Sequence, residues 1–195
     1  MMEWKDGKTR CKWANPNNAA YLHYHDEEWG VPVHEDHKLF EMLILECFQA
    51  GLSWECILNK QEAFRKAFDE FDLEKVCEYG EEKIEELCKN KEIIRNRLKI
   101  NAAVNNARIF REIQKEYGSF SKYLWHWTDE KVIYENDVVS SPLSDRVSKD
   151  LKKRGMKFVG TVIIYSYMQA VGVIYSHEKG CFMEHKKMET GCLQV

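Results

Sequence analysis

The sequence contains few residues that interrupt helices. Only three prolines and ten glycines occur among its 195 residues. Strict alternation of apolar and polar residues, which is typical of half-buried strands, is also scarce. Because proline and glycine are the main breakers of helices, their scarcity leaves long segments free to be helical. The chain contains no internal repeat and no low-complexity tract.

A membrane span and a secretion signal are missing as well. The most apolar run, residues 158–175, is interrupted by Gly160, Ser166, Gln169 and Gly172, so we expect a buried helix there. The first ten residues are polar and charged, unlike a signal peptide. Seven cysteines, an odd number at irregular spacing, indicate free or metal-bound thiols. These features predict a cytoplasmic protein with no membrane partner.

The chain also lacks a strong excess of charge of either sign. It has 29 Lys and Arg against 32 Asp and Glu, a formal net charge of −3. Overall electrostatics therefore do not indicate nucleic-acid binding, which would need a local basic patch. The candidates for contacts with a DNA backbone are Arg95, Arg97, Lys99 and Lys153. A basic run of this kind is also typical of an ordinary solvated helix face.

Apolar residues recur at helical spacing along most of the chain. The expected helices cover residues 39–48, 81–89, 97–116, 144–154 and 159–175, with Gly51 and Gly155 as stop signals for the first and fourth. The length and the 44% hydrophobic content suit one globular domain. We therefore predict a single all-α domain over residues 1–195, with a core of residues 10–183 and flexible ends at 1–9 and 184–195.

Two Cys/His pairs lie at opposite ends of the chain, Cys11 with His25 and His177 with Cys181. Two thiolates and two imidazoles form a set that zinc binds in a closed tetrahedral site, where no position is left for water and the role is structural. His177 and Cys181 are four residues apart, so one turn can present both to one ion. The pairs are far apart in sequence, however, and buried free cysteines with ordinary histidines also explain them.

Glu46 is almost alone among apolar residues in the segment MLILECF. A carboxylate in such a helix is costly unless it is paired or hydrogen-bonded, so a functional acid is one explanation. The alternative is a glutamate at the edge of the helix that reaches solvent or pairs with an arginine.

Aromatic residues are concentrated in the first third of the chain. They are Trp13, Tyr21, Tyr24, Trp29 and Trp54. Such side chains can form the walls of a pocket for a flat heterocycle, because every base offers a π face. Ordinary core packing is the alternative and the usual fate of aromatic residues.

Several segments, in one order over nearly the whole chain, carry a resemblance to a known family. They are residues 10–13 (RCKW), 24–32 (YHDEEWGVP), 45–54 (LECFQAGLSW), 93–100 (IIRNRLKI), 152–160 (KKRGMKFVG) and 165–170 (YSYMQA), followed by His177 and Cys181. In these segments the chain resembles bacterial DNA-3-methyladenine glycosylase I, the constitutive alkylation-repair family. Several long motifs in one order make the resemblance more specific than any single pattern above.

The resemblance implies an all-α helix-hairpin-helix glycosylase fold in which one structural zinc ion joins the N- and C-terminal segments. The zinc ligands of the family match Cys11, His25, His177 and Cys181. No organic cofactor is implied. The hairpin matches residues near 90–99.

The resemblance also implies a base pocket and an element that enters the DNA. The pocket residues of the family match Trp13, Tyr21, Tyr24 and Trp54 around a catalytic Glu46. The turn Gly51-Leu52 matches the wedge that fills the gap left by a flipped base.

The implied activity is hydrolytic excision of 3-methyladenine from alkylated double-stranded DNA by a monomeric, monofunctional enzyme. Such an enzyme flips the base out, leaves an abasic site and does not cut the strand. Trp13 and Trp54 would attract the cationic base, and an ionised Glu46 would accept hydrogen bonds from its amine edge. Two alternatives stay open, a glycosylase for another alkylated purine and a non-catalytic, zinc-stabilised DNA-binding module. A zinc hydrolase is disfavoured, because four protein ligands leave no position for water.

Two positions depart from the pattern of the family. Glu92 stands where a small turn residue is often found in a DNA-binding hairpin. Tyr175 and Ser176 replace an Asn-Asp pair that commonly precedes the zinc histidine. We expect the first departure to affect the hairpin geometry and the second to affect the surroundings of His177.

Overall fold

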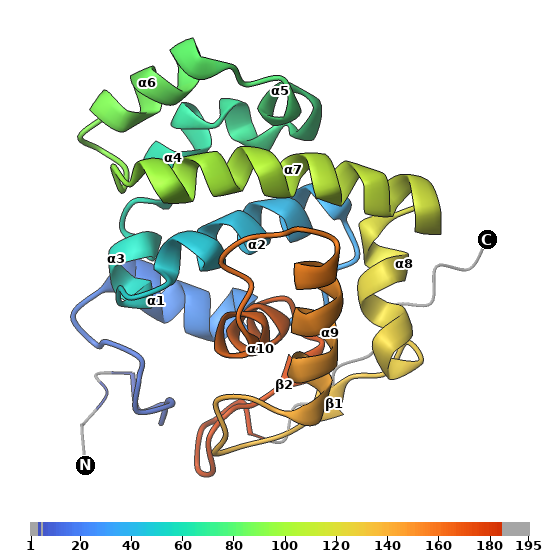
Figure 1. Cartoon of the computed structure of the whole chain (residues 1–195). Coiled ribbons are helices and arrows are strands. Elements are labelled where there is room, and N and C mark those ends of the chain that lie inside the picture. Colours follow the sequence, from blue (N-terminus) through green and yellow to red (C-terminus); the bar gives the residue numbers. More distant parts are fainter. Residues whose placement is uncertain (1–3, 5, 185–195) are drawn as a thin grey trace.

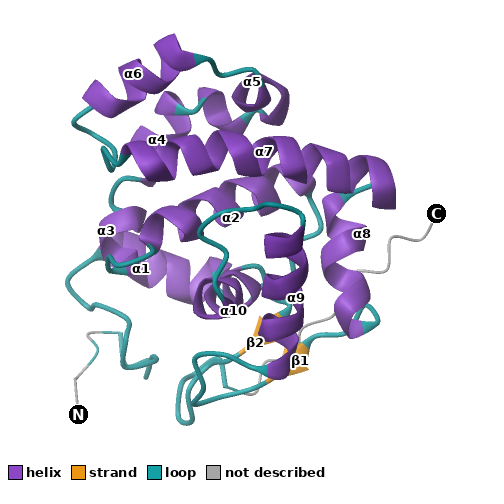
Figure 2. Cartoon of the chain, viewed as in Figure 1, coloured by secondary structure: helices purple, strands orange, loops and turns teal. Residues whose placement is uncertain are grey.

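The computed structural model describes residues 4 and 6–184, and this part of the chain is predominantly helical (Figures 1 and 2). The α-helices are α1 (Ala19–His23), α2 (Asp36–Gln49), α3 (Trp54–Leu58), α4 (Gln61–Ala67), α5 (Leu73–Cys77), α6 (Glu81–Lys89), α7 (Arg97–Tyr117), α8 (Phe120–Trp125), α9 (Pro142–Lys153) and α10 (Thr161–Ala170). Shorter π or 3₁₀ segments are η1 (Tyr24–Glu28), η2 (Asp69–Phe71) and η3 (His126–Thr128). Of the expected flexible ends at 1–9 and 184–195, residues 1–3, 5 and 185–195 lie outside the described residues. No helix in the described part is both long and apolar enough to cross a membrane.

Helix α7 lies at the centre of the molecule. It packs against α2 on one side, against α5 and α6 on the other, and against α8 near its C-terminal end (Figure 1). Its buried face follows the helical spacing and includes Ile100, Val104, Ala107 and Phe110. Buried residues from Cys11 to Met183 belong to one continuous hydrophobic cluster.

Local signals account for several helix ends. The Asn96 side chain caps α7 by accepting from the Lys99 N–H, and Gly118 ends this helix with a φ of 86°. Helix α9 begins before the expected residue 144, because Ser141 forms a capping box with Ser144 and a proline occupies the first turn.

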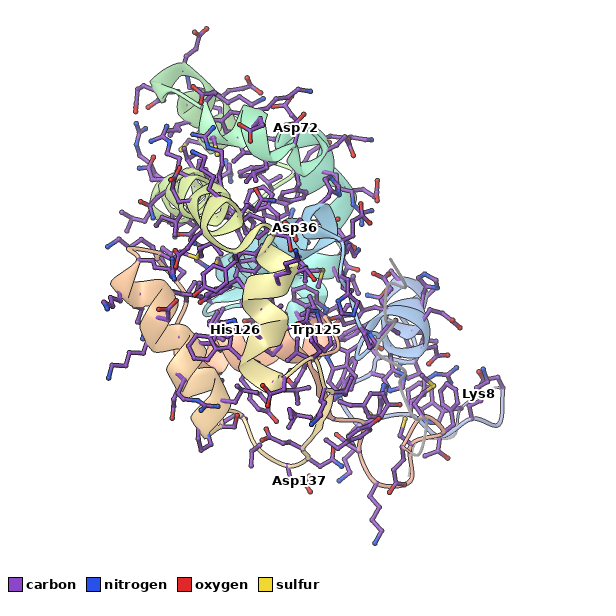
Figure 3. The ribbon with its side chains drawn as sticks, turned by 90° about the vertical axis from the view of Figure 1, so that its right-hand side faces the viewer. Lys8, Asp36, Asp72, Trp125, His126 and Asp137 are labelled. Atoms are coloured by element: carbon purple, nitrogen blue, oxygen red, sulfur yellow. The ribbon has the colours of Figure 1, made fainter. Side chains whose placement is uncertain are left out.

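Helix α8 depends on a residue from another helix. The Asp36 carboxylate, at the start of α2, accepts hydrogen bonds from the Phe120 N–H and the Ser121 N–H. Figure 3 shows Asp36 where these two helices meet. An acidic side chain at a helix N-terminus satisfies free amides and complements the helix dipole.

The expected helix over residues 159–175 is wrong at its C-terminal end. Helix α10 stops at Ala170, and β2 (Ile174–Tyr175) then pairs in parallel with β1 (Ile133–Tyr134). Gly172 makes the turn with a φ of 73°, and a Cβ there would lie 2.3 Å from the Val31 carbonyl carbon. The close approach of another backbone segment therefore decides where the helix ends, and the apolar run does not reveal it.

Helices α6 and α7 form a helix–loop–helix unit at the place expected for the hairpin. The loop covers residues 90–96 and is called the hairpin loop below. The Asn90 side chain accepts from the Glu92 N–H, and the Glu92 carbonyl accepts from Lys60 Nζ at 2.8 Å. The loop at Glu92 is therefore held through its backbone, while its side chain is exposed.

Candidate functional site

A small pocket lies where the N-terminal segment meets α2, α3 and α10, and we call it the base pocket. Its volume is about 170 Å³, and it is lined by Trp13, Tyr21, Tyr24, Trp29, Glu46, Gln49, Trp54, Ser166 and Gln169. This volume is below the roughly 300–1,000 Å³ of pockets for drug-sized ligands. The cavity therefore suits a single heterocycle. All five residues expected around it are brought together.

Glu46 is the carboxylic acid of this pocket. Its side chain is on the buried face of α2, with 3% of the residue exposed, and its Oε2 atom has no hydrogen-bond partner. Burial raises its pKa from 4.5 to about 8, so the isolated protein favours the neutral acid at pH 7. This differs from the ionised Glu46 expected from the sequence. Neither alternative, solvent access or a pairing arginine, is found among the described residues.

The aromatic residues form the walls of the pocket. The ring centroids of Trp13 and Tyr21 are 5.5 Å apart, and those of Tyr24 and Trp54 are 5.3 Å apart. Trp29 also packs edge-on against Trp13 at 4.9 Å. Trp13 and Trp54 stay half-buried, which leaves part of both rings available to a ligand. Several electron-rich faces around one cavity attract a flat or cationic heterocycle.

Polar side chains from α10 complete the pocket and were not expected from the sequence. Ser166 and Gln169 are three residues apart and face the cavity from one side of that helix. Gln49 faces it from α2, one turn after Glu46. One feature of the sequence could have indicated this role, because Ser166 and Gln169 interrupt the most apolar run of the chain. A polar residue inside a buried helix needs a partner, and a ligand can supply it.

The turn after α2, residues 50–52, is called the wedge turn below. Gly51 has a φ of 79°, and Leu52 is 37% exposed. The Leu52 N–H donates to the Gln49 carbonyl at 2.7 Å, and Gln49 Nε2 donates to the Leu52 carbonyl at 2.9 Å. The turn therefore exposes the apolar Leu52 side chain to solvent, while its hydrogen bonds with Gln49 hold its conformation.

The four Cys and His residues expected as zinc ligands are buried and lie together. Their ligand atoms all lie within 4.8 Å of one another. The Sγ atom of Cys181 is 3.6 Å from His25 Nε2 and 3.6 Å from His177 Nδ1, and the Cys11 Sγ is 3.5 Å from that same Nδ1. Zinc bond lengths of about 2.3 Å to sulfur and about 2.0 Å to nitrogen give tetrahedral edges of about 3.5 Å. The residues therefore fit one tetrahedral zinc ion.

Hydrogen bonds from neighbouring groups orient these ligands. His25 Nδ1 is 2.8 Å from Asp26 Oδ1, which directs Nε2 towards the sulfurs. Asp26 is held in turn by Arg10, whose Nε is 2.8 Å from Oδ1. Backbone amides of Glu178 and Met183 donate to the two cysteine sulfurs. Amide donors of this kind stabilise thiolates.

The Tyr175 departure affects the surroundings of His177 through packing. The Tyr175 ring lies 5.0 Å from the His177 ring, and its hydroxyl donates to the Met183 carbonyl. The side chain therefore covers the cluster and ties β2 to the segment after Cys181.

The Cys/His cluster lies directly behind the base pocket. Trp13 contacts the His25 ring at 5.0 Å, and Trp29 contacts the His177 ring edge-on at 4.7 Å. Two pocket walls therefore pack directly on the two imidazoles of the cluster.

The four basic residues expected at a DNA backbone have different surroundings. Arg95 and Lys153 are exposed. Arg97 is exposed but forms ion pairs with Glu81 and Glu85 of α6. Lys99 points inward and is 7% exposed, and its Nζ donates hydrogen bonds to backbone carbonyl groups. Its placement does not fit a direct phosphate contact.

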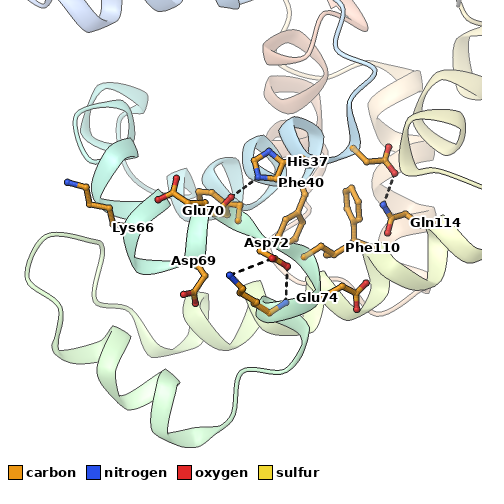
Figure 4. A pocket seen from close by; sticks show the side chains of 13 residues that line it. His37, Phe40, Lys66, Asp69, Glu70, Asp72, Glu74, Phe110 and Gln114 are labelled. Carbon is orange, nitrogen blue, oxygen red and sulfur yellow. Dashed lines mark hydrogen bonds and ion pairs between the residues drawn. The ribbon is translucent and has the colours of Figure 1, made fainter.

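A larger groove of about 840 Å³ opens between η2, α5, α2 and α7 and shares no lining residue with the base pocket. Figure 4 shows Asp69, Asp72 and Glu74 on its rim and the His37 ring next to the Glu70 carbonyl. Its acidic rim is unsuited to DNA phosphates, and several of its polar groups are already paired, such as Asp36 with Gln114 and Asp72 with Lys75.

Comparisons with known proteins agree with this geometry. A family model described as methyladenine glycosylase matches residues 13–185. The chain is 42% identical over 178 residues to DNA-3-methyladenine glycosylase 1 of Escherichia coli (strain K12), which covers 88% of this chain and 95% of the relative.

Solved structures are similar in fold. The 3-methyladenine DNA glycosylase I from Staphylococcus aureus has a TM-score of 0.87 and 36% identity, covering 91% of this chain and 97% of that chain. A variant of 3-methyladenine DNA glycosylase I in complex with 3-methyladenine has a TM-score of 0.86 and 36% identity, covering 91% of this chain and 98% of that chain.

The fold, the pocket and these similarities define a glycosylase, an enzyme that hydrolyses N-glycosyl bonds. The chain belongs to the methyladenine glycosylase family, whose members named above are DNA-repair enzymes for alkylation damage.

Proposed function

We propose that this protein excises 3-methyladenine from alkylated double-stranded DNA by hydrolysis of the N-glycosyl bond. The observation that carries the proposal is the buried, unpartnered Glu46 carboxyl group at the wall of a small aromatic pocket. The complex of a similar glycosylase with 3-methyladenine supports this choice of base. The product is an abasic site, and the strand is not cut.

The pocket selects for the alkylated base by charge. A 3-methylated adenine in DNA is cationic, and the faces of Trp13 and Trp54 attract cations. A cation beside Glu46 also favours the carboxylate over the neutral acid. The carboxylate then accepts a hydrogen bond from the amine edge of the base and stabilises positive charge while water attacks the sugar carbon. Neutral adenine supplies no such compensation for the cost of ionising Glu46.

Base flipping involves the wedge turn. Extrusion of a nucleotide costs a few kcal/mol, and less for a damaged base. Leu52 would fill the vacated position in the stack, as apolar wedges do in DNA-bending proteins. The positive φ of Gly51 lets the backbone turn sharply towards the DNA.

The DNA backbone is contacted by few groups in this proposal. Amides of the hairpin loop, together with Arg95 and Lys153, would bind phosphates as in a helix-hairpin-helix unit. Such contacts position the enzyme without reading sequence. A monomer suffices, because the pocket, the wedge turn and the loop all belong to one chain.

Zinc is proposed as a structural ion, one per chain, held by Cys11, His25, His177 and Cys181. When bound, it supplies no reacting group but joins the two ends of the chain behind Trp13 and Trp29. A cytoplasmic location is proposed as well, since seven cysteines at irregular spacing favour free or metal-bound thiols.

The test is release of free 3-methyladenine from methylated duplex DNA, with zinc measured on the same samples. Wild type should release the base, and Glu46→Gln should lose excision far more than DNA binding. Glu41→Gln is the matched control, because Glu41 is also buried on α2 but pairs with Arg65 away from the pocket. Equal loss of binding and excision in Glu46→Gln would refute its assigned role. Release of a different alkylated purine would favour the alternative substrate, and no release by a folded, zinc-loaded protein would favour a non-catalytic DNA-binding module.

A further inference from the structure

Lys99 forms an unusual contact for a residue in a basic run. Its ammonium group donates to the Phe48 carbonyl at 2.8 Å and to the Ala50 carbonyl at 2.6 Å. These carbonyls belong to the last turn of α2 and to the wedge turn. Lys99 itself is on the first turn of α7, directly after the hairpin loop. One side chain therefore connects the loop expected at the DNA backbone with the turn expected inside the DNA.

The environment of Lys99 indicates a specific role for this contact. Within residues 4 and 6–184, no carboxylate lies within ion-pair distance of its Nζ, although the residue is only 7% exposed. Burial lowers the pKa of the ammonium group below its usual value. The charge is compensated by carbonyls at the negative end of α2 and by the Phe158 ring, 6.0 Å away. A buried lysine is costly, and a cap on free carbonyls at a helix end offsets that cost.

A second lysine forms the reciprocal contact. Lys60, which follows α3, donates to the Glu92 carbonyl in the hairpin loop at 2.8 Å. The wedge side therefore binds a carbonyl of the hairpin loop, and the hairpin side binds carbonyls of the wedge turn. Because the Lys99 and Lys60 contacts run along different lines, together they resist both sliding and rotation of the hairpin loop relative to the wedge side.

We propose that Lys99 is a positioning residue that sets the wedge turn at a fixed separation from the hairpin loop, with Lys60 in a supporting role. DNA held by its phosphates at the loop then meets Leu52 at the depth of the base stack. The inference rests on the proposed function. It predicts that Lys99 acts through Leu52 on the DNA duplex and has little influence on how the pocket binds a free base.

The test compares Lys99→Met with Lys115→Met, a change of an exposed lysine near the other end of α7. Lys99→Met keeps the apolar stem and removes two charge-assisted hydrogen bonds. We expect kcat/KM for excision from duplex DNA to fall about tenfold or more. The affinity for free 3-methyladenine, followed by tryptophan fluorescence, should change by less than about twofold. Lys115→Met should leave both quantities unchanged.

A double-mutant cycle with Leu52→Ala separates positioning from general destabilisation. If Lys99 acts through the wedge, Lys99→Met should cost less than about twofold in the Leu52→Ala background. Should Lys99→Met fail to fold, Lys60→Met replaces it in the cycle, because the half-exposed Lys60 loses a single contact. Lys60→Met should lower duplex excision by a smaller factor than Lys99→Met and leave free-base affinity unchanged. In the Leu52→Ala background, Lys60→Met should cause no further loss.

Three results would overturn the proposal: unchanged duplex excision in both lysine variants, equal losses of excision and free-base affinity, or losses that multiply with that of Leu52→Ala. A wild type that releases no base refutes the proposed function instead. The two failures are therefore distinguishable.

Discussion

At the scale of single residues, the state of Glu46 is the central property of the site. The residues directly beside it in α2, Leu45 and Cys47, are apolar, and no described cation or amide donates to Oε2. The free protein therefore favours the neutral acid, and in the proposed function a cationic base would favour its ionisation. In the proposed function, selectivity depends on the charge difference between the cationic alkylated base and neutral adenine. This charge difference changes the binding energy more than one methyl group does in a hydrophobic pocket.

Glu46→Gln should change how stability depends on pH. The pKa of Glu46 is raised from 4.5 to about 8, so the folded protein binds more protons than the unfolded chain between these values. Stability contributed by the neutral acid is complete below about pH 4.5 and is lost as pH rises towards about 8. Glutamine does not titrate. The variant should gain stability relative to wild type across this window, by a few kcal/mol at its upper end.

Denaturant midpoints measured at intervals from about pH 4 to about pH 9 check this expectation. Glu41→Gln serves as the control for loss of a buried carboxylate on α2, since Glu41 pairs with Arg65 away from the pocket. Parallel stability curves for wild type and Glu46→Gln would contradict the raised pKa of Glu46.

At the scale of elements, the wedge turn depends on one backbone conformation. Gly51 has a φ of 79°, and nothing lies within 4 Å of the position that a Cβ would take. Gly51→Ala therefore introduces backbone strain without a clash, with a cost of about 1 kcal/mol. We expect a small fall in Tm and a larger relative fall in duplex excision, because relief of the strain moves Leu52.

Gly118→Ala is the matched control for that substitution. Gly118 has a φ of 86° at the end of α7, and a Cβ there meets only the flexible Lys122 side chain. Both variants should lose similar stability, measured by thermal unfolding, but only Gly51→Ala should lose excision. Equal excision by the two variants would show that the conformation of the turn does not matter for DNA.

At the scale of the whole molecule, the Cys/His cluster joins the two ends of the chain behind the base pocket. Cys181→Ser should lower Tm by about 10 °C or more, because a structural metal contributes directly to folding free energy. It should also weaken binding of 3-methyladenine, since Trp13 and Trp29 rest on His25 and His177.

Cys88→Ser is the control, because Cys88 lies at a half-buried position on α6 outside the cluster. This variant should change neither Tm nor base affinity. Zinc content and base affinity measured on both variants decide this. An unchanged affinity for 3-methyladenine in a metal-free Cys181→Ser protein would show that base binding does not depend on the metal.

DNA binding by the whole molecule should depend only weakly on salt. The net charge is −3, Lys99 is bound to carbonyls and Arg97 is paired with α6. Contacts with two or three phosphates predict a slope of about −2 to −3 in a plot of log affinity against log salt concentration. Fluorescence anisotropy with undamaged duplex at several salt concentrations measures it. A slope near that of ten phosphate contacts would require a basic surface different from the one observed here.

The sequence alone determined the helical class, the positions of the five longest helices and the types of side chain available for metal and base binding. Helices at 81–89 and 97–116 could be predicted because periodicity, caps and stop signals are local. The Cys and His residues and the aromatic residues were also visible as candidates, and a resemblance to one family grouped them. The contribution of Ser166 and Gln169 to the pocket was not predicted.

Only the tertiary structure decided which of these groups meet and in what state. The end of α10 depends on Val31, the pKa of Glu46 on its enclosure, and the role of Lys99 on carbonyls about 50 positions earlier in the chain. Lys99 and Lys153 are both basic residues in motif-bearing segments, yet one is buried and the other exposed. Local spacing sets which face of a helix a residue occupies. The solvation of a side chain, and hence its charge and its partners, depends on elements that pack against that face from distant parts of the chain.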